Sequence, residues 1–244
     1  MRRSLTLLTA LILSAGVSST ALLAASEPAP DAADAPNTVE GEIVRAAAPV
    51  LVIGLDLSKS NPMVTNDDYA RRVADRVAPM VEAMPLRGRV MVRSFGSYDA
   101  TSNTLRIDQV LSARAKPADF ARGLSTLIAG VPKLVRDGKL VAQNKTNILP
   151  FLQTMSQVVD CKEQPVTFVL LTDGVEDSEY ARLKNASATL PAPEHQRFEG
   201  CADLQILGLG QGLNSPKATE RLRTTWSGWA DGAGFQNFVG LYDW

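Results

Sequence analysis

A carboxylate and two hydroxyls follow the first strongly apolar segment of the chain. The run VLVIGL (50–55) leads directly into Asp56, and Ser58 and Ser60 come two and four positions later. Side chains at a spacing of two lie on the same side of an extended chain. We therefore expect these three oxygen-bearing side chains to converge just beyond the end of a strand, as ligand-binding side chains do.

Two further oxygen donors occupy similar positions later in the chain. Asp173 follows the apolar run VTFVLL in the sequence LLTDG, and Thr146 lies in NKTNI, just before a helical pattern. Ligand sites in open α/β sheets lie at the carboxyl ends of the strands. The sequence therefore predicts that Asp56 and Asp173 share one edge of a sheet.

The types of these side chains predict a hard divalent cation. Two carboxylates that lie close together repel each other, which raises a pKa unless a cation balances the charge. A donor set made only of oxygens, without His or Cys, favours Mg²⁺, with Mn²⁺ and Ca²⁺ as alternatives. If the carboxylates bind through water, the metal keeps an open position that would attract an outside carboxylate.

In this order the residues resemble the metal-ion-dependent adhesion site (MIDAS) of the von Willebrand factor type A (vWA) domain. That family's motif is Asp-x-Ser-x-Ser, a distant Thr and a more distant Asp, matched here by Asp56, Ser58, Ser60, Thr146 and Asp173. The resemblance covers roughly residues 49–240. It implies a Rossmann-like three-layer α/β fold, with helices on both faces of a mostly parallel sheet. It also implies that an Asp or Glu of a partner protein completes the metal shell.

Four neighbours of the predicted ligands are expected to face that partner, namely Lys59, Asn61, Asn147 and Gly174. Lys59, between the two serines, would steer an acidic partner, or it is an ordinary solvated side chain. The chain departs from the family pattern in its longer segment before Thr146. The helix predicted there, at about 117–136, either borders the metal face or packs elsewhere.

Three functions fit a metal at this position. The one we expect is a protein-binding module, not an enzyme, that captures an acidic residue of its partner. A metal-dependent hydrolase is the second, because a bound cation can activate water, although no general base or nucleophile is evident in the sequence. The third is a structural domain whose metal only stabilises the fold.

Strand and helix patterns alternate along the chain from Pro49 onward. Apolar runs predict strands at 50–55, 89–96, 104–111, 166–171 and 204–210, and the second and third of these are expected to form a hairpin. Apolar residues at helical spacing predict helices from 67, at 117–136, at 147–160 and from 216, with Pro132 kinking or ending the second. Such alternation predicts a mostly parallel sheet that is covered on both faces.

The N-terminal residues predict export. A short basic start is followed by an uncharged run from Leu5 to Ser26 that ends in small residues. This layout predicts a signal peptide at 1–25, with an uncleaved membrane anchor as the alternative. An Ala/Pro-rich linker at 26–48 would follow, and then one domain at 49–244. We therefore expect the protein in the periplasm or secreted, and at the membrane only if the segment stays uncleaved.

The cysteines and the net charge add two expectations. Cys161 and Cys201 are the only two cysteines, and each precedes a strand-like run. In an exported protein such a pair predicts a disulfide, with two separate buried thiols as the alternative. The net charge of −1 provides no basic surplus for nucleic acid, so we expect no nucleic acid as a partner.

Overall fold

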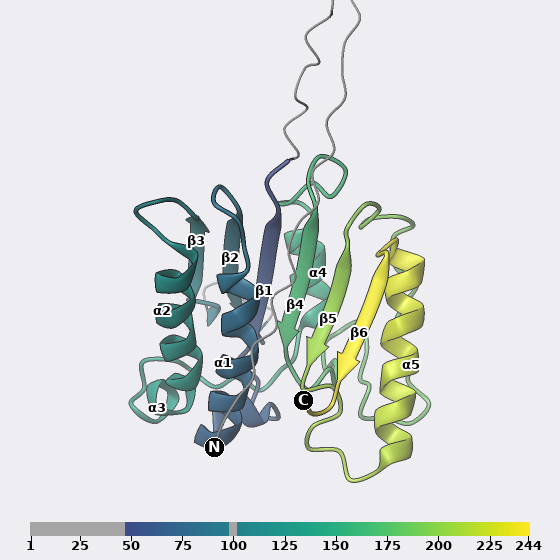
Figure 1. The fold of residues 1–244 in the computed structure, drawn as a ribbon. Coiled ribbons are helices and arrows are strands. Elements are labelled where there is room, and N and C mark those ends of the chain that lie inside the picture. Colours follow the sequence, from purple (N-terminus) through teal and green to yellow (C-terminus); the bar gives the residue numbers. More distant parts are fainter. Residues whose placement is uncertain (1–46, 98–101) are drawn as a thin grey trace, which may run out of the picture. The chain divides into compact units, whose positions relative to one another are not determined.

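A single six-stranded sheet organises the residues that the computed structural model describes, which are 47–97 and 102–244 (Figure 1). The strand order is β3-β2-β1-β4-β5-β6. The strands are β1 (Val50–Asp56), β2 (Arg89–Phe95), β3 (Arg106–Val110), β4 (Val166–Leu171), β5 (Asp203–Leu207) and β6 (Asn237–Leu241). The predicted signal peptide at 1–25 and nearly all of the predicted linker at 26–48 lie outside the described residues.

The sheet is mixed but mostly parallel. Strand β3 pairs antiparallel with β2, which confirms the predicted hairpin, and the other neighbouring strands are parallel. Every residue of β1 is buried, as expected for a central strand whose two faces are both covered. Strand β6, at 237–241, was not among the strands predicted from the sequence, and it completes the sheet beside β5.

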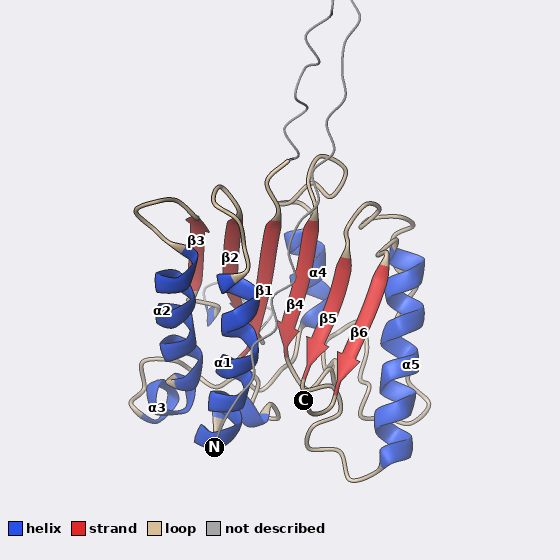
Figure 2. Cartoon of the chain, viewed as in Figure 1, coloured by secondary structure: helices blue, strands red, loops and turns tan. Residues whose placement is uncertain are grey.

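Helices cover both faces of the sheet, so the described residues form an α/β fold (Figure 2). Alternate residues of β1 and β2 enter two separate apolar clusters: one contains α1 and α2 side chains, and the other contains α4 and α5 side chains. The helices are η1 (Pro62–Val64), α1 (Asp67–Glu82), α2 (Pro117–Ala129), α3 (Val131–Arg136), α4 (Ile148–Met155) and α5 (Pro216–Ala233). This arrangement is compatible with a Rossmann-like fold.

Three predicted boundaries were wrong. The helix expected at 117–136 is two helices, which break at Gly130, and Pro132 lies in the first turn of α3. The helix expected to reach residue 160 ends at Met155, because the next residues form turns, with Val158 N–H donating to the carbonyl of Met155. The strand expected at 204–210 ends at Leu207, since the following Gly208 has a φ of +109° that a strand cannot accommodate.

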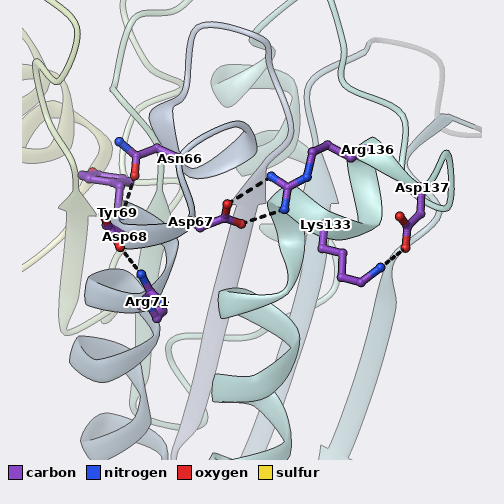
Figure 3. Close-up of polar contacts among 8 residues, drawn as sticks. All are labelled: Asn66, Asp67, Asp68, Tyr69, Arg71, Lys133, Arg136 and Asp137. Atoms are coloured by element: carbon purple, nitrogen blue, oxygen red, sulfur yellow. Dashed lines mark hydrogen bonds and ion pairs between the residues drawn. The ribbon is translucent and has the colours of Figure 1, made fainter.

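The second half of the segment at 117–136 lies beside the short helix that follows the loop with Ser58 and Ser60. Helix α2 packs on α1, and α3 contacts both α1 and η1, which directly follows that loop. Figure 3 shows the carboxylate of Asp67, at the start of α1, bonded twice to the guanidinium of Arg136 at the end of α3, with N–O distances of 3.0 and 3.2 Å. Of this segment, α3 therefore lies beside η1, whereas α2 packs on α1.

A disulfide joins Cys161 to Cys201, as predicted. The two cysteines precede β4 and β5, which are parallel neighbours and therefore begin side by side. Disulfides form and persist in oxidising compartments, so this bond is typical of a protein that folds outside the cytoplasm. Over residues 47–97 and 102–244, no helix combines the length and the apolar character that crossing a bilayer requires.

Candidate metal centre

Asp56 ends β1 with its side chain wholly buried and fixed in orientation. One carboxylate oxygen, Oδ1, accepts the backbone N–H of Ser58 at 2.7 Å. The other, Oδ2, accepts the hydroxyl of Thr172 at 2.6 Å. Thr172 directly follows β4, the strand beside β1, so Asp56 is held from both strands at the carboxyl edge of the sheet.

Ser58, Ser60 and Asp173 join the same cluster. The hydroxyl oxygens of Ser58 and Ser60 lie 3.2 Å apart. Asp173 lies close to them, because burial raises its pKa and the Ser60 side chain lowers it, and its Oδ1 accepts the N–H of Val175 at 2.8 Å. The structure therefore brings together four of the five predicted ligands, with Ser60 as the exposed member.

Thr146, the fifth predicted ligand, is buried on an adjoining loop. Backbone hydrogen bonds of 2.8 Å join Gln143 to Leu57 and to Lys59, so the chain before Thr146 runs beside the loop after β1. No hydrogen bond links the Thr146 hydroxyl to the other four ligands within the described part of the chain. Its membership of the site therefore remains a prediction that this loop placement favours.

Burial and mutual repulsion disfavour the charged forms of the two carboxylates. Burial, and then the charge of Asp173, raise the pKa of Asp56 to about 7. Burial also raises the pKa of Asp173. Neither carboxylate forms an ion pair with any described lysine, arginine or histidine. Two buried like charges are costly unless a cation balances them, and a divalent cation at this place would do so.

The donor set suits a hard cation. The described residues contain no group of three or more His, Cys, Asp or Glu side chains that could hold a metal. A metal at this edge would therefore depend on hydroxyl oxygens in addition to Asp56 and Asp173. Such all-oxygen sets favour Mg²⁺ and related ions over zinc or copper, so these side chains fit the cation predicted from the sequence.

The four predicted partner-binding residues occupy different environments. Lys59 is exposed beside the cluster, whereas Asn61 and Asn147 are buried. The Asn61 amide donates to the carbonyls of Asp56 and Leu171, at 2.9 Å each, and so ties the ends of β1 and β4 together. For these asparagines, contact with a partner stays a prediction, because in this structure both amides face the protein's own backbone.

Asn147 and Gly174 hold neighbouring loops in place. The Asn147 amide donates to the carbonyl of Gly96 at 2.6 Å. Gly174 has a φ of +74°, and its carbonyl accepts the indole N–H of Trp226 at 2.7 Å. An added Cβ would lie 2.6 Å from a methyl carbon of Leu209. Gly174 is therefore required by backbone geometry and close packing, whatever its role toward a partner.

Sequence reasoning missed two residues that position the site. Thr172 holds the carboxylate of Asp56 in place. Its position next to Asp173 in LLTDG was the only feature of the sequence that could have indicated this role. Glu176 is wholly buried, and its Oε2 accepts the N–H groups of Ile148 and Leu149 at 2.8 and 3.1 Å. Nothing in the sequence marks Glu176, although it joins the loop after Asp173 to the helix after Thr146.

Comparison with known proteins gives no match in sequence: no protein-family model and no curated protein matches the chain. Among solved structures, the pilus adhesin SpaC from Lactobacillus rhamnosus GG is similar at 13% identity with a TM-score of 0.42, covering 80% of this chain and 28% of SpaC. The mussel byssus protein PTMP1 is 14% identical, with a TM-score of 0.45 and coverage of 81% and 44%.

The PilB minor pilin from Streptococcus sanguinis, as its D319A mutant, is 13% identical, with a TM-score of 0.44 and coverage of 83% and 59%. The chain thus spans less than two thirds of the length of each of these proteins. With TM-scores below 0.5, we draw no conclusion about this chain from them.

Proposed function

We propose that the chain is an exported protein-binding module of the vWA type, which binds Mg²⁺ at a MIDAS and captures an acidic residue of a partner protein. The observation that carries this proposal is the buried pair Asp56 and Asp173, which lies with two serine hydroxyls at the carboxyl edge of the sheet and forms no ion pair with a described cation.

The arrangement of the donors favours capture of an outside ligand. Asp56 and Asp173 are buried beneath the loop, while Ser60 and Lys59 are exposed. A cation held here would have protein oxygens on its buried side and solvent on the other. When bound, it would supply the positive charge that attracts a carboxylate. The exposed Lys59 adds to that attraction.

Two features support the rest of the proposal. The Cys161–Cys201 disulfide fits export, although the predicted signal peptide and anchor lie outside the described residues. Both carboxylates already accept hydrogen bonds from the protein, Asp56 from Ser58 and Thr172 and Asp173 from Val175. These hydrogen bonds fix the orientation of both carboxylates, as a metal ligand requires. A general base, in contrast, must exchange protons with a substrate.

The proposal is tested by metal uptake and by an acidic probe. Isothermal titration of the full chain with Mg²⁺ or Mn²⁺ should show one site, and Asp56→Asn and Asp173→Asn should each abolish it. Saturation-transfer NMR would then follow the blocked peptide Gly-Gly-Asp-Gly-Gly. We expect binding in Mg²⁺, none in EDTA, and none for the same peptide with Asn in place of Asp.

A matched control is Asp75→Asn, which removes an exposed carboxylate from α1 and should leave both measurements unchanged. Absence of Mg²⁺ and Mn²⁺ uptake by the unaltered chain would refute the metal site. Metal uptake without any metal-dependent peptide binding would instead favour the purely structural alternative. Metal-dependent turnover of phosphoester or peptide substrates would favour the hydrolase.

A further inference from the structure

A basic pocket lies next to the candidate metal centre. It is a cavity of about 340 Å³ lined by Lys145, Asp177, Arg182, Lys184 and Asn185. Three of these side chains are cations and one is an acid. Lys145 and Arg182 are exposed, at 48% and 69% of their side-chain surface, so an outside ligand can reach them.

The single acid does not balance the three cations. Asp177 Oδ1 lies 3.2 Å from the Lys145 ammonium and 3.9 Å from the Arg182 guanidinium, so one carboxylate serves both. Lys184 makes no ion pair with any described residue, and Glu179, an exposed acid of the same loop, does not line the pocket. The basic pocket therefore keeps a local excess of positive charge in a chain whose net charge is −1.

The basic pocket and the metal centre share their loops. The backbones of Thr146 and Asp177 pair through two hydrogen bonds of 3.3 and 3.0 Å. Residues paired in this way have Cα atoms about 5.5 Å apart. Lys145 precedes Thr146 in the chain, and Lys184 lies close enough to Asp173 for its charge to act on that carboxylate. A ligand that occupied both places would therefore need to span only a short distance.

We propose that the basic pocket receives a second acidic side chain of the same partner, so that the partner is a peptide segment with two acids, one on the metal and one in the pocket. This inference rests on the proposed function. Alternate residues of an extended peptide point to the same side and lie about 6.6 Å apart, so two acids at this spacing can face two neighbouring places. The segment that fits is thus acidic and extended, with the pattern Asp-x-Glu or Asp-x-Asp.

The test compares two blocked peptides that differ in one group, Gly-Asp-Gly-Glu-Gly and Gly-Asp-Gly-Gln-Gly, on the full chain in Mg²⁺. Their dissociation constants would be measured by NMR titration at low ionic strength. We expect the doubly acidic peptide to bind roughly threefold to tenfold more tightly, the gain that one or two exposed ion pairs provide. The double variant Arg182→Gln/Lys184→Gln should remove this preference without weakening Mg²⁺ uptake, because it takes a positive charge away from the neighbourhood of Asp173.

Arg114→Gln/Lys116→Gln is the matched control, because it removes two charges just before α2, in a segment that does not line the basic pocket. It should keep the preference. Equal binding of the two peptides, or an equal loss of preference in both double variants, would overturn the inference while metal uptake and EDTA sensitivity still upheld the proposed function. If the unaltered chain takes up no metal, the proposed function fails. In that case, a preference for the doubly acidic peptide that is lost only in Arg182→Gln/Lys184→Gln would still support binding of an acid in the basic pocket. If the unaltered chain shows no such preference, the pocket is overturned as well.

Discussion

Replacement of Glu176 by Gln should stabilise the protein at alkaline pH but not at acidic pH. Burial raises the pKa of this carboxyl to about 7 from its ordinary value of 4.5. A carboxyl whose pKa is higher in the folded state stabilises the fold fully below the unfolded pKa, and this contribution is lost as the pH rises through the folded pKa. The glutamine side chain of the variant cannot ionise, so the variant should not lose this stability.

The size of the effect follows from the two pKa values. One pKa unit corresponds to about 1.4 kcal/mol. Between pH 5 and pH 8, the shift from 4.5 to about 7 therefore lowers the free energy of unfolding by about 2.5 kcal/mol. The Gln side chain keeps a carbonyl oxygen that can accept the two N–H groups at the start of α4. We expect Glu176→Gln to match the unaltered chain at pH 5 and to exceed it by about 2.5 kcal/mol at pH 8.

Urea unfolding, followed by the fluorescence of the buried Trp226 and Trp229, measures this difference. Comparison of the two proteins in the same buffer cancels the titration of all other groups, and excess Mg²⁺ would keep the candidate metal centre in one state. Glu179→Gln, at an exposed position three residues along, is the control and should show no such pH dependence. The reasoning would be refuted if the stability of Glu176→Gln relative to the unaltered chain were lower at pH 8 than at pH 5. The ionised carboxylate would then stabilise α4 by more than its burial costs.

Two other changes test the frame around the site. Replacing both Cys161 and Cys201 with Ala should lower the free energy of unfolding by about 3–4 kcal/mol, since the bond closes a loop with a sequence separation of 40. Calorimetry should show this loss, while Mg²⁺ uptake by the folded variant should persist, because the bond lies at the strand beginnings. Gly174→Ala should cost at least about 2 kcal/mol, from its φ of +74° and the 2.6 Å approach to Leu209; an unchanged melting temperature would contradict this.

Much of the fold could be predicted because its signals are local. The apolar runs that become β1 and β4 are continuous, as in strands buried on both faces. Helix boundaries were less accurate where local signals compete. Pro132 indicated a break, but the sequence did not show that the break falls at Gly130, two residues earlier, so that the proline lies in the first turn of a new helix.

The candidate site was only partly predictable, for the same physical reason. Asp56, Ser58 and Ser60 lie within five consecutive residues, so their convergence follows from the chain's own geometry. Thr172 bonds Asp56 across 116 positions, and Glu176 reaches Ile148 across 28. Contacts of that range depend on which strands become neighbours, and the order of residues along one chain does not specify this.

The positioning bonds also explain why a buried pair of acids can persist at the carboxyl edge of the sheet. Asn61 ties the end of β1 to the end of β4, so the backbones that carry Asp56 and Asp173 cannot move apart without breaking buried hydrogen bonds. Glu176 likewise holds the start of α4 against the loop after Asp173. The repulsion between the two carboxylates is therefore retained in the fold instead of being relieved by movement. A site built in this way is pre-organised for a cation, and binding the cation removes a cost that the folded chain already carries.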